Sequence, residues 1–298
     1  MVQSQGQVIA TFSRRMSLRL TDNTVVTARI KGKRLQPVCG DQVGAEPIPG
    51  ETDWLITEIH ERSNALTRPN LRGQAEVLAA NVELLIVVSA PEPSPDWFIV
   101  DRYLSAAENM AIPSAVVFNK IDLDNDDNNT AALSDYEAIG FDVVRCSAET
   151  SIGIDEVQAI IAGSTAIIVG QSGVGKSSII NRLLGGEQQR TAEISAKTGE
   201  GRHTTVNSVM LDLPGGGRVI DSPGVRDYAP ALESSQQVIK GFREIAAAGS
   251  ECRFADCRHL REPGCEVKAR VTDETISARR YESYRRLLAL TEQMDRQY

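Results

Sequence analysis

The chain has 298 residues, enough for one large domain or two to three small ones, and its 41% hydrophobic and 24% charged residues are typical of a globular protein. No apolar run approaches the roughly 18 residues of a membrane span. The first residues do not resemble a signal peptide, and five cysteines are too few for a disulfide framework. These features argue against a membrane-spanning or disulfide-stabilised protein, and we expect a cytoplasmic one.

The net charge of −8 is distributed unevenly along the chain. Residues 1–70 carry 9 Lys/Arg and 7 Asp/Glu, residues 71–239 carry 11 and 23, and residues 240–298 carry 12 and 10. The acidic excess therefore lies in the middle, and both ends are mildly basic. Nucleic-acid affinity depends on local patches rather than on total charge, so both ends are candidate RNA contacts. The alternative is that these are solvated faces without a partner.

Residues 1–68 are predicted to form a small β-barrel domain. Short alternating segments separated by turn residues indicate about five strands. The size suits an OB-fold, a barrel that often binds oligonucleotides, while an SH3-like barrel is the alternative. The stretch 14–34 contains seven basic residues and one acidic residue, which would suit a contact with RNA phosphates.

Residues 69–228 are predicted to form an α/β domain, after a linker at 67–70. Apolar strands alternate with helices, among them those expected at 96–110 and 153–162. This alternation predicts a mostly parallel sheet that is covered on both faces. Ligands of such sheets bind beyond the carboxyl ends of the strands, and the motifs described next fall in loops just after predicted strands.

The segment 170–177 fits the phosphate-binding pattern G-x-x-x-x-G-K-[ST] and lies between an apolar strand and a predicted helix. Its glycines let the backbone wrap around phosphate oxygens, and the helix N-terminus adds N–H donors. We expect Lys176 to reach the β- and γ-phosphates as a catalytic residue, and Ser177 to bind Mg²⁺. The predicted phosphate-binding residues are Gly170, Gln171, Ser172, Gly173, Val174, Gly175, Lys176, Ser177 and Ser178.

The sequence Asn119-Lys120-Ile121-Asp122 indicates that the bound nucleotide is GTP. The Asp122 carboxylate can accept hydrogen bonds from N1–H and the 2-amino group of guanine, whereas adenine would leave this carboxylate unpaired. We expect Asn119 to tie this loop to the P-loop, and the stem of Lys120 to cover the base. All four residues are predicted to bind the nucleotide.

Two further short motifs complete the predicted nucleotide contacts. Ser147 and Ala148 follow an apolar strand, and their turn is expected to donate a backbone N–H to guanine O6. Asp221 and Gly224 frame a D-x-x-G motif after another apolar strand. We expect Asp221 to hold Mg²⁺ through water and the N–H of Gly224 to contact the γ-phosphate.

The segment between the P-loop helix and the D-x-x-G motif is expected to contain the residues that respond to GTP. Thr205 is predicted to complete the Mg²⁺ shell, with Thr204 as the alternative. Val225 stands where Ras-like enzymes have a glutamine that orients the attacking water, and valine cannot perform that task. We therefore predict that His203 orients the water, while a purely structural role for His203 is the alternative.

Residues 229–298 are predicted to form a metal-binding helical domain. Cys252, Cys257, His259 and Cys265 have the spacing C-x4-C-x-H-x5-C. Three thiolates and an imidazole suit tetrahedral Zn²⁺ and leave no open position, which predicts one structural zinc rather than a catalytic one. Free thiols are the alternative interpretation.

Helices are expected on both sides of this cluster, at 234–248 and 272–295. The second has an apolar side formed by residues such as Tyr284 and Leu288. Its four arginines, at 279, 280, 285 and 286, are expected on the remaining faces. Those faces are either solvated or in contact with RNA.

The motif order is unusual. In Ras-like chains the P-loop comes first, whereas here the base-binding motifs precede it, and only the cut point of the cyclic order has moved. With these motifs and the metal spacing, the chain resembles the circularly permuted ribosome-associated GTPases of the RsgA (YjeQ) family over nearly its whole length. The resemblance implies an OB-fold at 1–68, a zinc knuckle at 252–265, and a role in late maturation of the small ribosomal subunit.

We expect hydrolysis of GTP to GDP and phosphate with Mg²⁺ as cofactor. The expected partners are the small subunit and its rRNA, the protein is expected to be a monomer, and docking on the subunit is expected to stimulate turnover. Two other classes stay open, because the sequence does not identify the partner. One is a free-standing GTPase that acts on a non-ribosomal partner, and the other is an RNA-binding protein gated by the nucleotide.

Overall fold

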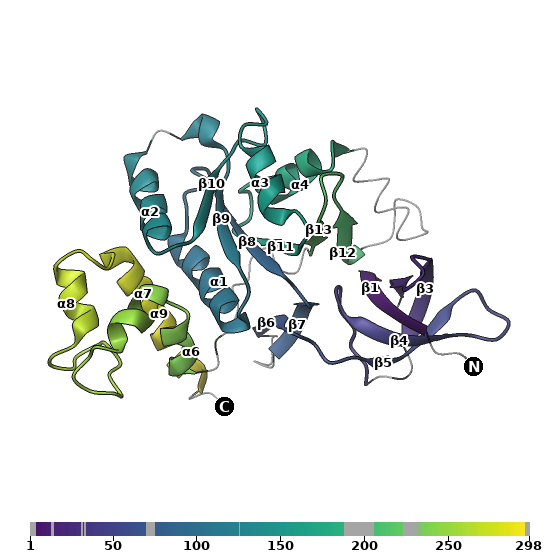
Figure 1. The fold of residues 1–298 in the computed structure, drawn as a ribbon, viewed down its shortest axis with the longest axis horizontal. Coiled ribbons are helices and arrows are strands. Elements are labelled where there is room, and N and C mark those ends of the chain that lie inside the picture. The colour runs from purple at the N-terminus through teal and green to yellow at the C-terminus, as the bar shows by residue number, and fades with distance from the viewer. Residues whose placement is uncertain are drawn as a thin grey trace.

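The computed structural model describes residues 4–12, 15–30, 32, 34–69, 75–124, 126–187, 206–222, 232 and 234–295. Three parts follow one another along the longest axis of the molecule (Figure 1). The N-terminal barrel lies at one end, a sheet covered by helices lies in the middle, and a C-terminal helical module lies at the other end.

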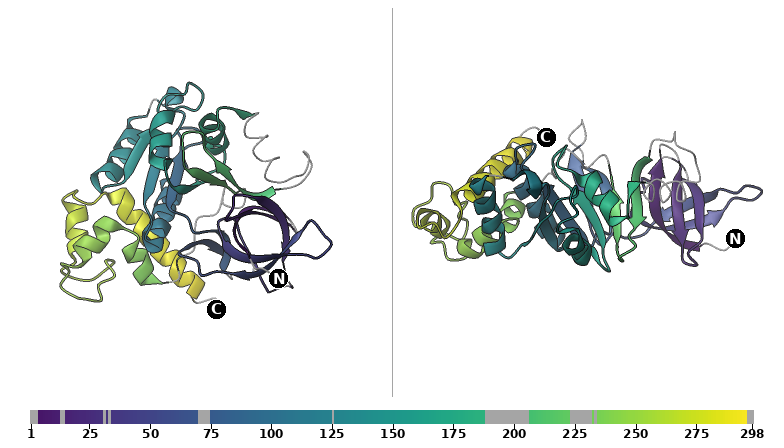
Figure 2. Two further views of the ribbon diagram at one scale, coloured as in Figure 1. Left: turned by 45° about the vertical axis from the view of Figure 1, so that its right-hand side comes forward. Right: turned by 90° about the horizontal axis from the view of Figure 1, so that it is seen from above.

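Strands β1 to β5 close into the N-terminal barrel, which is seen end-on in Figure 2 (left). β1 pairs with β2 and β4, β2 pairs with β3, and β5 lies between β3 and β4. The pairing of β3 with β5 is parallel and the others are antiparallel, which is the five-stranded Greek-key arrangement of the OB-fold. Val8, Leu18 and Ile56 are fully buried inside it. The bounds are β1 Ser4–Phe12, β2 Met16–Leu20, β3 Val25–Ile30, β4 Gln42–Pro47 and β5 Trp54–Ile59.

The middle sheet has the strand order β10-β9-β8-β11-β13-β12. All neighbours are parallel except β12 and β13, which are antiparallel. Apolar residues dominate β8, β9 and β11, as expected for strands buried on both faces. The bounds are β8 Leu84–Ser89, β9 Ser114–Phe118, β10 Asp142–Arg145, β11 Thr165–Val169, β12 Val206–Asp212 and β13 Arg218–Asp221.

Helices cover both faces of this sheet. One buried cluster joins α3 and α4 to the sheet, and a second joins α1 and α2 to the opposite face. Asp96 caps α1 by accepting hydrogen bonds from the N–H groups of Phe98 and Ile99, so this predicted helix begins where the sequence indicates. The bounds are α1 Trp97–Met110, α2 Asp127–Ala138, α3 Ile154–Ile161 and α4 Lys176–Leu183.

Strand β1 belongs to the barrel and also extends the middle sheet. It pairs antiparallel with β12, so that Ala10 lies opposite Val209 and Thr11 opposite Ser208. Ile9 and Phe12 join the two buried clusters of the middle sheet instead of the barrel interior. The barrel is therefore fixed to the edge of the sheet by backbone pairing and by shared core side chains.

The segment predicted as a linker is part of a hairpin. Residues 67–69 end strand β6 (Ala65–Pro69), which pairs antiparallel with β7 (Ala75–Ala80). Pro69 is tolerated because it is the last residue of an edge strand. The hairpin contacts the barrel closely at Gly40, where a Cβ atom would lie 2.0 Å from the carbonyl oxygen of Ala80.

The C-terminal module contains α6, α7, α8 and α9, and two helices differ from their predicted bounds. The helix expected at 234–248 divides at Gly241, where a Cβ atom would lie 1.7 Å from the Ser105 hydroxyl of α1. The helix expected at 272–295 begins at Ala278, after a turn that follows α8. The bounds are α6 Ser235–Lys240, α7 Arg243–Gly249, α8 Glu266–Thr272 and α9 Ala278–Asp295.

These three parts confirm the predicted multidomain α/β fold. The structure places a closed five-stranded barrel, a P-loop sheet with the permuted strand order and a helical module with a Cys/His cluster that could hold a metal in that order along the chain. In the part of the chain that the structure describes, no helix is both long and apolar enough to cross a bilayer.

Candidate nucleotide site and metal centre

The P-loop connects β11 to α4, as its sequence predicts. Gly175 has a φ of +93° and caps α4, and a Cβ atom there would lie 2.2 Å from the Asn119 side-chain nitrogen. The ammonium of Lys176 donates to the carbonyl oxygens of Gly170 and Gln171, each at 2.6 Å. Lys176 is only 8% exposed, so its charge is held inside the loop that is expected to enclose phosphates.

The guanine-specificity loop is tied directly to the P-loop. The buried Asn119 side chain donates to the carbonyl oxygen of Val174 at 2.9 Å. Lys120 donates to the carbonyl oxygens of Gly173 and Glu92 at 2.8 and 2.7 Å. Asp122 lies on the next turn and is exposed, so its carboxylate is accessible to a base. These hydrogen bonds join the two loops into one unit.

The Ser147–Ala148 turn is adjacent to this unit. The N–H of Ala148 donates to the side-chain oxygen of Asn119 at 2.9 Å, and the N–H of Ser147 donates to the carbonyl oxygen of Ile152. Both N–H groups thus have partners within the protein. A contact of this turn with guanine O6 stays a prediction.

The candidate Mg²⁺ residues lie at the carboxyl ends of two neighbouring parallel strands. Ser177 is in the first turn of α4, after β11, and Asp221 ends β13, which pairs with β11. A hydroxyl and a carboxylate are hard oxygen donors, which fit Mg²⁺. His203, Thr204, Thr205 and Gly224 lie outside the described residues.

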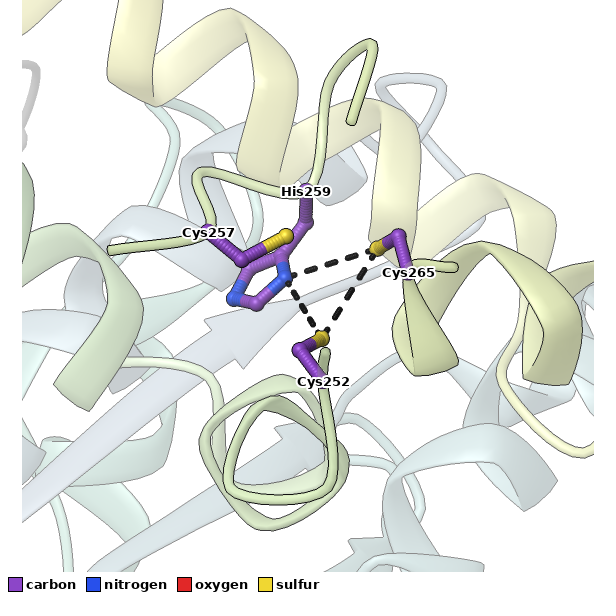
Figure 3. Close-up of side chains that lie close together, drawn as sticks. All are labelled: Cys252, Cys257, His259 and Cys265. Atoms are coloured by element: carbon purple, nitrogen blue, oxygen red, sulfur yellow. Dashed lines mark hydrogen bonds between the residues drawn. The ribbon is translucent and has the colours of Figure 1, made fainter. Parts of the chain in front are cut away.

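The four predicted metal ligands come together in one cluster (Figure 3). The ligand atoms of Cys252, Cys257, His259 and Cys265 all lie within 4.8 Å of one another. Nδ1 of His259 is 3.5 Å from the Cys252 sulfur and 3.6 Å from the Cys265 sulfur. Three sulfurs and one imidazole nitrogen in this arrangement fit a tetrahedral metal such as Zn²⁺.

The metal loop, residues 252–265, is held in place by residues to which no sequence motif assigns that role. The Glu262 carboxylate accepts N–H groups of residues 258, 260 and 261 at 2.8–3.2 Å. Burial alone would raise the pKa of Glu262, but these N–H groups lower it to about 2. The hydroxyls of Tyr281 and Tyr284 donate to the carbonyl oxygens of His259 and residue 258. The loop is therefore anchored to α9 independently of a metal.

We expect the replacement Cys265→Ser to lower the zinc affinity of the protein by more than about 100-fold, because a ligand contributes more than an outer-shell residue. Burial raises the pKa of Cys257 to about 12, so this thiol is protonated at neutral pH unless a cation stabilises the thiolate. Zinc content after dialysis, measured by atomic absorption, checks this expectation.

Cys39→Ser is the matched control for that variant. Cys39 is also buried, but it lies in the second core cluster, away from the metal loop. The control should retain full zinc content. Equal zinc content in both variants would contradict the metal assignment.

Two arginines of α9 occupy positions that differ from the expectation of solvated or RNA-contacting faces. Arg280 is 1% exposed and donates to the carboxylates of Asp101 at 2.7 Å and Glu244 at 2.9 Å. Arg279 is mostly buried and contacts Asp101 and the Tyr136 hydroxyl. We call these five residues the Asp101 network. The network joins the C-terminal module of α6 to α9, called the metal module below, to α1 and α2.

Most of the described basic residues in the barrel stretch have acidic partners. Arg15 lies 3.7 Å from Asp53, and Arg29 lies 3.4 Å from the same carboxylate. Arg19 donates to both carboxylate oxygens of Asp212 in β12. Arg34 is exposed. The positive charge expected for RNA contact is therefore partly neutralised on this face.

Comparisons with known proteins agree with this geometry. A family model described as RsgA GTPase matches residues 59–230. A protein of Marinobacter nauticus, named small ribosomal subunit biogenesis GTPase RsgA, is 38% identical and covers 99% of this chain and 86% of its own length. A protein of the same name from Pseudomonas aeruginosa is 36% identical, with 98% and 87% coverage.

Two solved structures share the whole architecture. YjeQ from Thermotoga maritima superposes with a TM-score of 0.75 at 26% identity, covering 97% of this chain and 99% of its own. The circularly permuted GTPase YloQ superposes with a TM-score of 0.73 at 25% identity, with 98% and 96% coverage. With the family match and the full-length relatives, this similarity shows that the chain belongs to the RsgA GTPase family.

Proposed function

We propose that this chain hydrolyses GTP to GDP and phosphate and acts as a late assembly factor of the small ribosomal subunit. The observation that carries the GTPase part is the hydrogen bond from Asn119 to Val174, which joins a guanine-specificity loop to a P-loop. The names of its full-length relatives support the ribosomal part.

The residues of the chain have separate roles in this reaction. Lys176 stabilises the charge that develops on the phosphate oxygens. Ser177, Thr205 and, through water, Asp221 would hold Mg²⁺, which would supply further neutralisation of the phosphates when bound. With Val225 in place of a glutamine, His203 orients the attacking water. We therefore expect slow turnover by the protein alone.

Docking on the small subunit raises this slow turnover. The barrel and the metal module provide the surfaces that face the rRNA, and one zinc ion in the metal module has a structural role. The protein acts in the cytoplasm as a monomer. β1 of the barrel pairs with β12 of the GTPase sheet, and this pairing supports direct coupling between docking and catalysis.

The replacement Asp122→Asn is expected to lower GTP affinity by more than about tenfold and to raise the affinity for xanthosine triphosphate. The amide loses the pair of acceptors that match the guanine N1–H and 2-amino groups, and its NH₂ group can donate to the 2-oxo group of xanthine. Competition against a fluorescent GDP analogue measures both affinities. The control Asp127→Asn, an exposed acidic residue at the start of α2, should leave both unchanged. Retained preference for guanine would contradict the assignment of Asp122.

Sedimentation with purified ribosomal subunits tests the proposed partner. The protein is incubated with small or large subunits, in GDP or in a non-hydrolysable GTP analogue, and centrifuged through sucrose. We expect retention on small subunits that is stronger with the GTP analogue. Equal retention on both subunits, or none on either, would contradict the ribosomal part of the proposal and leave the GTPase part standing.

A further inference from the structure

Three strands meet at the edge of the sheet where Asp221 ends β13. β12 lies between β1 of the barrel and β13, so residues at one level of β12 have neighbours on both sides. Thr11 of β1 lies opposite Ser208. The antiparallel ladder of β12 and β13 pairs Val209 with Asp221, so Ser222 is the next residue opposite Ser208. Three hydroxyl side chains thus form a row across the three strands.

The hydroxyls of Ser208 and Ser222 are buried and bonded to each other. Ser208 Oγ donates to Ser222 Oγ at 2.8 Å, and it also lies 2.8 Å from the carbonyl oxygen of Asn207. Both serines are 6% exposed. Because water has little access, removal of the Ser208 hydroxyl would leave the Ser222 hydroxyl without this partner, which is costly. Removal of the Ser222 hydroxyl would leave Ser208 only its contact with the carbonyl oxygen of Asn207 and would release the link between the two strands.

This bond lies one residue beyond the last pair of the β12–β13 ladder. Side chains alternate along a strand, so Ser222 and Ile220 point to the face covered by α1, and Asp221 points to the face of α4. α4 begins with the P-loop lysine and Ser177. The Ser208–Ser222 bond thus fixes the end of the strand on one face while the Asp221 carboxylate faces the P-loop on the other.

We propose that Ser208 and Ser222 are positioning residues for the Mg²⁺-binding carboxylate of Asp221. They do not touch the nucleotide or the metal themselves. Their hydrogen bond fixes the position of the C-terminal end of β13. Because β12 also pairs with β1, this position is linked to the barrel. The inference rests on the proposed function in one respect, because it takes Asp221 as a residue that holds Mg²⁺.

Release of a fluorescent GDP analogue at a series of Mg²⁺ concentrations tests this role without measuring hydrolysis. For Ser208→Ala we expect the Mg²⁺ concentration that half-maximally slows release to rise about tenfold. Release in EDTA should stay within about twofold of the original protein, because the P-loop and the base loop are unchanged. Ser222→Ala should have the same effect. The double variant should show the same Mg²⁺ dependence as either single variant, because each single replacement already removes the same hydrogen bond.

Ser114→Ala is the matched control. Ser114 is also a buried serine of the same sheet, in β9, and its hydroxyl has no hydrogen-bond partner among the described residues. Its Mg²⁺ dependence should match that of the original protein. A thermal melt of each variant confirms that it is folded.

The outcomes separate this inference from the proposed function. If the original protein retains GDP in a Mg²⁺-dependent manner and Ser208→Ala matches it, the positioning role is wrong and the GTPase site stands. Equal acceleration of release with and without Mg²⁺ would also overturn the positioning role, because it would indicate a general loosening of the pocket. If the original protein shows no Mg²⁺ dependence at all, the Mg²⁺ site itself is wrong.

Discussion

The replacement Lys176→Ala is expected to lower GTP turnover by about 100-fold or more, the size of effect seen when one preorganised charge or donor is removed from a reacting phosphate or oxyanion. The Lys176 ammonium is almost fully buried and bonded to two P-loop carbonyl oxygens. Alanine would leave the phosphates facing an uncharged loop. Phosphate release at saturating GTP measures the effect.

Lys176→Arg separates position from charge. The guanidinium keeps the charge but is larger than an ammonium, and the P-loop surrounds Nζ closely, so turnover should fall in this variant too. Lys240→Ala removes an exposed lysine from α6 and should have no effect. Turnover of Lys176→Ala within about threefold of the original protein would contradict the assigned catalytic role.

The second large effect concerns stability. We expect Arg280→Met to destabilise the helical module by about 3–5 kcal/mol, because it removes the cation from Glu244 and leaves buried Asp101 with only the more distant Arg279, at 3.4 Å. Asp101 is fully buried, and Arg280 is its closest charged partner at 2.7 Å. Burial opposes the charge of Arg280, yet the carboxylates of Asp101 and Glu244 raise its pKa, so the residue is charged throughout the accessible range. Denaturant unfolding, followed by circular dichroism, measures the loss.

Arg286→Met is the matched control on the same helix. Arg286 is exposed and lies 4.0 Å above the ring of Phe98, so its replacement should cost only about 1 kcal/mol. If Arg280→Met destabilised the protein no more than this control, the Asp101 network would not be what fixes the module to α1.

The Asp101 network also affects which part of the protein can respond to a change of the bound nucleotide. Asp221 is 14 residues before α6, the first helix of the metal module, and this short separation alone would favour reorientation of that module. The buried bonds of Arg280 to Asp101 instead hold the module against α1. The barrel, paired through β1 with the strand next to Asp221, is the better placed part to respond.

Local motifs made much of the site predictable from sequence. The P-loop, the Asn119 loop and the four metal ligands are each defined by residues close together in the chain, and turn, strand and helix signals place them correctly. Neighbouring residues set the local context of each motif, and the Asn119–Val174 hydrogen bond then joins two of the motifs across 55 residues of sequence. The permuted order could also be identified from sequence, because each motif is recognisable wherever it lies in the chain.

Long-range contacts were outside the reach of this reasoning. Arg280 and Asp101 are 179 residues apart, and helical periodicity cannot distinguish a buried arginine with a carboxylate partner from a solvated one. The pairing of Thr11 with Ser208 likewise depends on where the barrel meets the sheet. The break at Gly241 was missed because it arises from close contact with Ser105 rather than from the local sequence.

The most direct test of the central claim is GTP turnover by the purified protein, alone and with purified small or large ribosomal subunits. We expect slow turnover by the protein alone, strong stimulation by small subunits and none by large subunits. No stimulation by either subunit would contradict the role in subunit assembly, and a free-standing GTPase would then describe the protein better.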